Sequence, residues 1–268
     1  MRKVISRFGF IVVFICLIGA LCGFSPVQAA EEEFHQTYTL KAGETVSVQS
    51  INGTVDVSSW NKDVVDVYAV KKTRYGRDKL DDVEIVISTN DGLVIETEHL
   101  TKNPRVSVNY TIKLPKNINL ALAKSTNGAI EVDGVSGDAV IRSTNGQIQI
   151  DNVNGIIDAQ TTNGKISIEN TRGLKQARTT NGSINVEITE LPDTDVEIKT
   201  TNGSVDMYLP EDLNADLELR TNNGRIRAND FRLLVNEISK NYISGQLGDG
   251  GKQLIVRTTN GSISINKL

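Results

Sequence analysis

Aliphatic residues recur with a strict nine-residue period in the middle of the chain. Glycine stands at positions 128, 137, 146, 155, 164, 173 and 182. The second and fourth residues after each of these glycines are aliphatic, with Lys175 as the one departure. Because alternate residues of a strand share one face, each nonapeptide predicts a short β-strand with its apolar side turned inward. A period without insertion or deletion is typical of a chain stacked on copies of itself.

Every second glycine completes the tripeptide Thr-Asn-Gly, so the structural repeat is two nonapeptides long. Strands after Asn-Gly carry large pairs such as Ile148 and Ile150, whereas the strands between them carry smaller pairs such as Ile157 and Ala159. The pattern predicts an all-β, single-domain β-solenoid: a β-helix-like stack of roughly 18-residue coils with two strands and two corners. We expect glycine to supply the positive φ that each sharp corner needs.

An antiparallel meander is the alternative fold, since Asn-Gly also favours hairpin turns. A solenoid would place Asn127, Asn145, Asn163 and Asn181 above one another, about 4.8 Å apart, where their amides can form a hydrogen-bonded ladder. A meander gives no reason for asparagine at every second corner only. We therefore favour the solenoid.

The repeat becomes irregular toward both ends, where we expect capping coils. The tripeptide returns at wider spacing at residues 201–203, 221–224 and 259–261. Upstream, Asn52 and Gly53 lie between valine pairs that fit the template, and residues 85–92 fit it less well. Residues 231–242 have near-helical apolar spacing and predict a short helix or a loop over the last coil. We divide the chain into residues 1–29, an irregular N-terminal region 30–120, and a regular solenoid with a C-terminal cap, 121–268.

The first 29 residues predict a secretory signal peptide. Arg2, Lys3 and Arg7 precede a charge-free run over residues 8–23, and an A-x-A-like site ends at Ala29. Cleavage after Ala29 is our preferred interpretation, and an uncleaved anchor helix is the alternative, because the apolar run approaches the length that spans a bilayer. Either way we expect the protein to be exported, and either secreted or associated with the cell envelope.

Composition narrows the classes of function. Both cysteines, Cys16 and Cys22, fall in the predicted signal, so the rest of the chain can form no disulfide. The formal net charge is −4 and falls to −7 without the three basic residues of the signal. Non-specific nucleic-acid binding is therefore disfavoured.

Several motifs together resemble a known family. They are Asn52-Gly53-Thr54-Val55 with Trp60 close behind, a strand over residues 106–112 that runs into Leu114-Pro115, the Thr-Asn-Gly repeats, and a glycine-rich segment 245–251 before residues 257–263. In order and over nearly the whole mature chain they resemble the bacterial putative-adhesin family of β-strand repeat proteins, a domain of unknown function. The resemblance implies an extracytoplasmic β-solenoid, attached to the envelope or linked to envelope stress, and brings no catalytic residues.

A basic residue stands three positions before almost every corner asparagine. The positions are Lys124, Arg142, Gln160, Arg178, Lys199, Arg220 and Arg257, six cations in seven coils. They predict a cationic stripe that binds an anionic envelope polymer, a membrane surface or another envelope protein. The alternative is an ordinary solvated face, partly neutralised where Asp158, Glu197 and Glu218 occupy the adjacent outward column.

Acidic residues form a second set, six positions after the corner asparagines, which we expect on the other sheet: Asp133, Asp151, Glu169 and Glu187. Calcium-binding rolls carry aspartate inside the corner, which these corners lack, so we expect no metal and no cofactor. The carboxylates are spread evenly, whereas a glycosidase needs them clustered, and His35 and His99 lie outside the regular coils. We expect a non-enzymatic interaction module; the alternatives are a polysaccharide-active β-helix enzyme and a purely structural envelope spacer.

Overall fold

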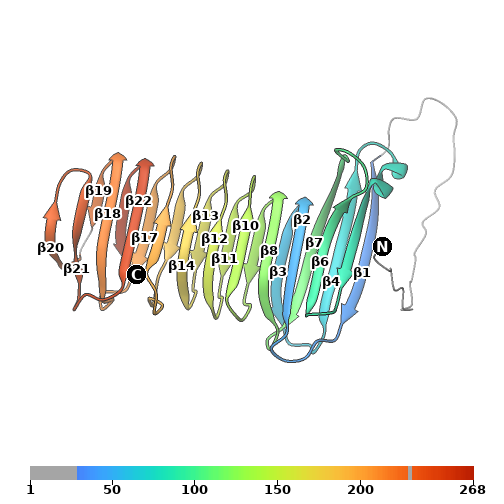
Figure 1. Ribbon diagram of the computed structural model, residues 1–268, viewed down its shortest axis with the longest axis horizontal. Coiled ribbons are helices and arrows are strands. Elements are labelled where there is room, and N and C mark those ends of the chain that lie inside the picture. The colour runs from blue at the N-terminus through green and yellow to red at the C-terminus, as the bar shows by residue number, and fades with distance from the viewer. Residues whose placement is uncertain (1–28, 229–230) are drawn as a thin grey trace.

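The computed structural model describes residues 29–228 and 231–268, in which the strands form two long sheets facing each other along a rod (Figure 1). All but the last residue of the predicted signal peptide lies outside the described residues. Among the described residues, no helix is long and apolar enough to cross a membrane.

The two sheets run the length of the rod. In spatial order, the eleven-stranded sheet consists of β1 (Ala30–Tyr38), β4 (Val65–Thr73), β7 (Val106–Pro115), β3 (Val55–Trp60), β9 (Ile130–Asp133), β11 (Ile148–Asp151), β13 (Ile166–Glu169), β15 (Ile184–Glu187), β17 (Val205–Leu209), β23 (Ile263–Lys267) and β19 (Ile226–Ala228). The twelve-stranded sheet consists, again in spatial order, of β20 (Leu233–Ile238), β21 (Tyr242–Leu247), β18 (Ala215–Asn223), β22 (Gln253–Asn260), β16 (Val196–Lys199), β14 (Gly173–Arg178), β12 (Ile156–Gln160), β10 (Ala139–Ser143), β8 (Asn119–Asn127), β2 (Thr45–Asn52), β6 (Leu93–His99) and β5 (Val83–Ser88). A 3-10 helix, η1 (Arg77–Asp82), packs against β1, β4 and β5.

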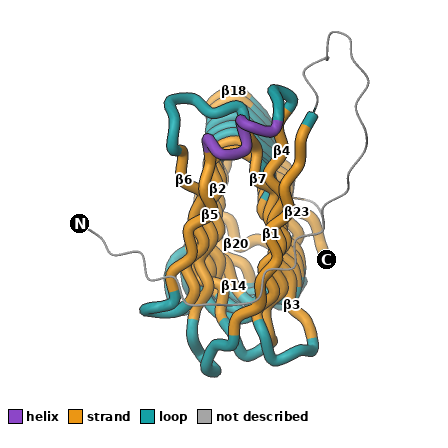
Figure 2. Tube along the Cα trace, turned by 90° about the vertical axis from the view of Figure 1, so that its right-hand side faces the viewer, coloured by secondary structure: helices purple, strands orange, loops and turns teal. Residues whose placement is uncertain are grey.

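The predicted β-solenoid of two-strand coils is confirmed. In the regular part each coil takes one strand from each sheet, and like strands of successive coils pair in parallel, as β10 pairs with β12 and β11 with β13. Viewed along the rod, the two sheets stand face to face with the loops gathered at the corners (Figure 2). Ile148 and Ile150 of β11 are at most 1% exposed and stack on Ile166 and Ile168 of β13. The period-two alternation therefore fills the space between the sheets.

Lys175, which breaks the apolar pattern, lies at a bulge in β14. Leu174 pairs with Ile157 of β12, but the next pair joins Gln176 to Asp158, so β14 has one extra residue at this point. A bulge shifts the alternation by one position. Leu174 is consequently buried in place of Lys175, whose side chain is exposed.

Coil order along the rod differs from sequence order at both ends. The β2–β3 coil lies between the β6–β7 coil and the β8–β9 coil, although β6 and β7 follow it in the chain. Likewise the β22–β23 coil, which ends the chain, lies between the β16–β17 coil and the β18–β19 coil. The β2–β3 coil and the β22–β23 coil thus have neighbouring coils on both sides, and the C-terminus lies inside the stack (Figure 1).

Antiparallel strands close both ends of the rod and correct two expectations. Residues 231–242 form neither a helix nor a loop over the last coil, because β20 pairs antiparallel with β21 as a hairpin. The open edge of β21 offers ladder hydrogen bonds that an extended segment can use and a helix cannot. At the other end β5 pairs antiparallel with β6 across the turn at residues 89–92, so this part of the N-terminal region is a hairpin and not a degenerate coil. The division of the chain at residue 120 stays a prediction.

The predicted asparagine ladder is confirmed and is longer than the four central repeats. Each corner asparagine except Asn52 donates a hydrogen bond from Nδ2 to Oδ1 of the asparagine in the coil next to it on the β2 side, over 2.7 or 2.8 Å. The ladder runs through Asn52, Asn127, Asn145, Asn163, Asn181, Asn202, Asn260 and Asn223. All seven bonds therefore point the same way along the rod.

At most ladder corners the glycine after the asparagine is needed for a reason other than the one expected. Glycines such as Gly146 and Gly164 do not have a positive φ. Their role is close approach: a Cβ on Gly164 would overlap the carbonyl oxygen of Gly146 in the next coil, and the same overlap recurs at the other ladder corners. The expected positive φ is found at Gly53 and Gly261 of the ladder corner and at Gly137 of the opposite corner, where Asn152 and Asn170 also have φ of 57° and 49°. Asparagine tolerates this left-handed conformation better than most residues.

A second column of polar groups lies inside the ladder corners. Two positions before each ladder asparagine, a buried hydroxyl donates to a carbonyl oxygen of the neighbouring coil over 2.8 to 3.4 Å. The donors are Ser50, Ser125, Ser143, Thr161, Thr179, Thr200, Thr221 and Thr258. In most coils the acceptor is the carbonyl of the corner glycine, so each corner is fixed to the next by both an amide and a hydroxyl.

The glycine contact predicts a sharp difference between two Gly→Ala variants. Gly164→Ala should lower the free energy of unfolding by at least about 2 kcal/mol, because the new Cβ meets backbone that cannot move aside. Gly173→Ala is the control, since its Cβ would have only ordinary contacts of 3.6 Å or more, and it should stay within about 1 kcal/mol of the wild type. Urea unfolding followed by circular dichroism measures both, and equal losses would contradict the packing argument.

The ladder predicts a cost for removing one of its central amides. Asn163→Ala deletes a donor and an acceptor and should destabilise the fold by about 1 to 2 kcal/mol. Asn185→Ala, at an outward position of β15, is the matched control and should change the free energy of unfolding by less than about 0.5 kcal/mol. If the two variants unfold at the same urea concentration, the ladder contributes nothing measurable.

Candidate functional site

The six predicted cations form one row across the outer face of the twelve-stranded sheet. In spatial order the cationic row consists of Lys124, Arg142, Arg178, Lys199, Arg257 and Arg220. Gln160 of β12 fills the position between the first two arginines. The order differs from the sequence in one respect: β22 lies between β16 and β18, so Arg257 separates Lys199 from Arg220.

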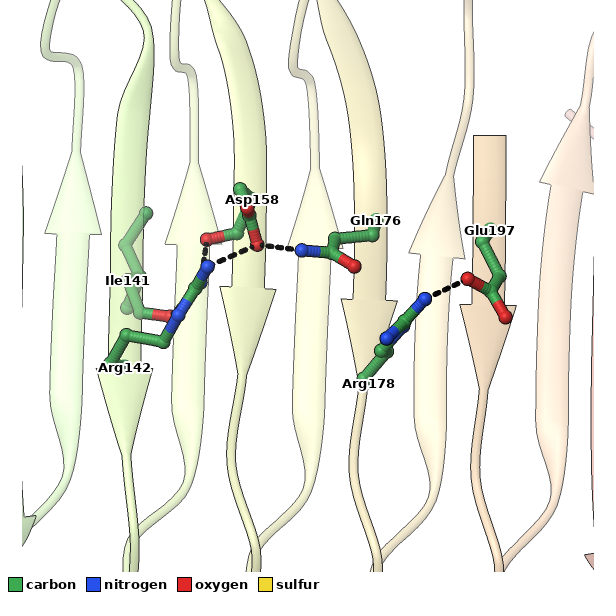
Figure 3. Close-up of polar contacts among 6 residues, drawn as sticks. All are labelled: Ile141, Arg142, Asp158, Gln176, Arg178 and Glu197. Carbon is green, nitrogen blue, oxygen red and sulfur yellow. Dashed lines mark hydrogen bonds and ion pairs between the residues drawn. The ribbon is translucent and has the colours of Figure 1, made fainter. Parts of the chain in front are cut away.

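Three arginines of the row are held by carboxylates on the next strand. Arg142 Nη2 lies 2.7 Å from Asp158 Oδ1, and its Nη1 donates to the Asp158 carbonyl oxygen over 2.6 Å. Gln176 donates to the same carboxylate over 2.7 Å, and Arg178 forms an ion pair with Glu197 (Figure 3). These contacts neutralise part of the row, as the alternative of an ordinary solvated face expects.

The third pair lies at the C-terminal end of the row. Arg257 Nη2 donates to Glu218 Oε1 over 2.8 Å, and this hydrogen bond is the main reason that the pKa of Arg257 rises above its ordinary value. The arginine stays charged at every pH at which the protein folds.

The other three cations have no acid in the corresponding place. Each paired arginine reaches the next strand toward β18, where it contacts the residue two positions before the one that it pairs with in register. Arg142, for example, pairs with Gln160 and contacts Asp158. For Lys124, Lys199 and Arg220 the equivalent neighbours are Val140, Ile255 and Ser244. All three cations are exposed, and none forms an ion pair with a described residue. They are the free charges of the row.

The free charges are not equivalent. Lys124 shares a hollow of about 250 Å³ with Glu96 and Glu98, so its surroundings are mixed in sign. Lys199, Arg257 and Arg220 occupy three adjacent strands, and Glu218 pairs with the middle one only. Like charges about 4.8 Å apart in water repel by roughly 0.9 kcal/mol. These last three positions of the row are therefore where positive charge is concentrated and least compensated.

The acidic residues form a separate row on the eleven-stranded sheet, as expected. Asp133, Asp151 and Glu169 stand in register on β9, β11 and β13. Asn152 donates to Asp133 over 2.8 Å, and Gln149 donates to Asp151 over 3.0 Å. Neighbouring amides thus separate the negative charges.

Neither a metal site nor a pair of histidines is found in the part of the chain that the structure describes. No group of three or more His, Cys, Asp or Glu among residues 29–228 and 231–268 is arranged to hold a metal ion. His35 of β1 lies 2.7 Å from Asp66, whereas His99 ends β6 in the other sheet. The structure does not bring the two histidines together.

Another carboxylate lies next to the acidic row in the adjacent outward column. Asp56 of β3 pairs in register with Glu131 of β9. Burial raises the pKa of Asp56 above its ordinary value, and the negative charge of Glu131 raises it further. Its ionised form is therefore disfavoured in the folded state.

The two sheets define a β-solenoid protein with the cationic row on one outer face and the acidic row on the other. Residues 28–266 match the Toastrack family, DUF4097, and the chain belongs to this family. The resemblance seen in its Asn-Gly and glycine-rich motifs is thereby confirmed. None of the curated proteins matches the chain.

Several solved structures are similar to it at low identity. A putative adhesin from Parabacteroides distasonis has a TM-score of 0.46 and 13% identity over 88% of this chain and 97% of its own. A putative adhesin from Bacteroides fragilis has a TM-score of 0.44, with the same identity and coverage. A putative lipid binding protein from Parabacteroides distasonis has a TM-score of 0.39 and 12% identity over 90% of this chain and 97% of its own. The chain is assigned to its family by the match over residues 28–266, and not by these structures.

The raised pKa of Asp56 predicts a pH-dependent gain from neutralising it. A raised folded-state pKa means that ionised Asp56 costs stability at neutral pH, and that this cost disappears once both states are protonated. Asp56→Asn should therefore unfold at a higher urea concentration than the wild type at pH 7. At about pH 3, below the ordinary aspartate pKa, the two should unfold together. A variant less stable than the wild type at pH 7 would show that the carboxylate is stabilising.

Proposed function

We propose that this protein is an exported, non-enzymatic module of the cell envelope that binds an anionic envelope polymer along the cationic row. One observation carries the proposal: six cations from six strands stand in register on the outer face of one sheet. Family membership and the predicted signal segment support a role outside the cytoplasm.

The spacing of the row favours a polymer over a compact ligand. Strands about 4.8 Å apart repeat the charge at short intervals along the rod, so a chain with regularly spaced anions can lie along several coils at once. Binding should be strongest over Lys199, Arg257 and Arg220, where positive charge is least compensated. Arg142 and Arg178 are engaged by Asp158 and Glu197 and are less available to a ligand.

A double variant tests the free end of the row. Lys199→Gln/Arg220→Gln should weaken binding to alginate or polyphosphate at least tenfold at low salt, because it removes both uncompensated charges of this cluster. The wild-type affinity should itself fall as salt is added. Isothermal titration calorimetry measures both effects.

Two further variants separate local contact from overall charge. Lys165→Gln/Arg172→Gln makes the same change in net charge at exposed positions off the row and should weaken binding less than threefold. Arg142→Gln/Arg178→Gln should fall between the two. Equal losses in all three would reduce the effect to net charge and remove the row as a site.

The alternative functions predict different results when the same wild-type protein is tested with further probes. Binding to phosphatidylglycerol vesicles but to neither polymer would make the ligand a membrane surface. Cleavage of a polysaccharide would make the protein an enzyme. A wild-type protein that binds none of these probes would be a structural spacer, and the proposal would fall.

A further inference from the structure

A cavity of about 550 Å³ lies near the N-terminal end of the rod, beside the last rung of the asparagine ladder. Its lining includes Asn52 from β2, Lys72 from β4 and Arg74 just after it. Arg105, which immediately precedes β7, completes the basic lining. The cavity therefore gathers three cations and one ladder amide from segments that are far apart in the chain.

The asparagine ladder stops at this cavity because the next coil has no Thr-Asn-Gly corner. Beyond the β2–β3 coil lies the β6–β7 coil, whose strands are joined by residues 100–105 instead of Thr-Asn-Gly. Pro104 and Arg105 of this connection line the cavity. No asparagine continues the ladder past Asn52 in the described part of the chain.

The direction of the ladder leaves a donor at this end. Asn52 Oδ1 accepts from Asn127 Nδ2 over 2.7 Å, and no described residue accepts from Asn52 Nδ2. Seven amide bonds aligned in one direction polarise one another, which strengthens the terminal N–H as a donor. At the far end of the ladder, Asn223 is in the opposite position, because its Nδ2 donates to Asn260.

The charge of the cavity matches an anion. Glu31 also lines the cavity, and its carboxylate lies 3.1 Å from Lys72 Nζ and neutralises this one of the three cations. The guanidinium of Arg105 lies 4.5 Å from the centre of the Tyr75 ring, and neither Arg105 nor Arg74 forms an ion pair with a described residue. Thr73 donates to the Arg105 carbonyl over 2.8 Å and ties the end of β4 to the start of β7. The two arginines are thus left with uncompensated charge beside a planar donor.

We propose that this cavity binds an oxyanion, a carboxylate or phosphate group, whose oxygens accept hydrogen bonds from Asn52 Nδ2 and from the guanidinium groups of Arg74 and Arg105. The ligand oxygen takes the place of the missing ninth rung. Arginine suits this chemistry because its planar fork matches the oxygens of either group. The site is separate from the cationic row and does not rest on the function proposed for it.

The test compares the two ends of the ladder. Asn52→Asp keeps an oxygen that can accept from Asn127 but replaces the terminal donor with an acceptor, so the ladder stays intact while the anion is repelled. Asn223→Asp puts the same residue at the opposite end, far from the cavity. Circular dichroism and thermal unfolding verify that both variants are folded.

Titration of the full-length protein with acetate and, separately, with inorganic phosphate measures binding, by calorimetry and by the ¹H–¹⁵N signal of the Asn52 side-chain amide. We expect Asn52→Asp and Arg105→Gln each to weaken binding at least tenfold and Asn223→Asp to change it less than twofold. The tighter of the two probes identifies the ligand as a carboxylate or a phosphate. Absence of wild-type binding to both probes, an unmoved Asn52 amide signal, or equal losses at both ends of the ladder would overturn the proposal.

Discussion

The repeating part of this protein depends on how closely one corner glycine approaches the carbonyl oxygen of the next. A side chain at Gly146 or Gly164 would fill the space that the neighbouring backbone occupies. Around this contact, the asparagine amides outside and the serine or threonine hydroxyls inside each bridge one coil to the next. The corner thus sets the distance between coils, and the stacked isoleucines of the core follow it. Inserted residues are therefore poorly tolerated at the asparagine corner and better tolerated at the opposite corner. The extra residues that widen the spacing of the Thr-Asn-Gly motifs in the C-terminal region lie at the opposite corner.

Strict stacking turns sequence positions into straight rows. A residue at a fixed distance from the corner asparagine falls on the same line in successive coils, so the cationic row lies on one sheet and the acidic row on the other. The consequences for chemistry depend on the neighbour one strand along. Where that neighbour is Asp158, Glu197 or Glu218 the arginine is held, and where it is apolar or uncharged the cation faces solvent. The free part of the row is therefore produced by the order in which coils are stacked.

The two ends of the rod differ from its middle in strand pairing and in coil order. Antiparallel strands cover the edges that a parallel stack would leave open, and the first and last template coils are enclosed one place in from the ends. Because the ladder has a direction, its two ends are chemically unlike. It leaves an amide donor at Asn52 and a carbonyl oxygen at Asn223. The donor end lies beside a cavity with basic side chains, so the proposed oxyanion site is separate in place from the cationic row.

The sequence by itself determined the repeating interior: the coil of two strands, the buried pairs, the ladder and the assignment of each charged row to its own sheet. These features follow from local periodicity, which acts in the same way in every repeat. Only the tertiary structure decided the coil order at the ends. If the coils were stacked in sequence order, β18 would lie next to β16 and Glu218 would face Lys199. Because β22 lies between these two strands, Glu218 pairs with Arg257 instead and Lys199 has no ion pair. The same holds for the terminal hairpin of β20 and β21, for the bulge that buries Leu174, and for the cavity beside Asn52. Each of these depends on pairing between segments distant in the chain, which no local pattern encodes.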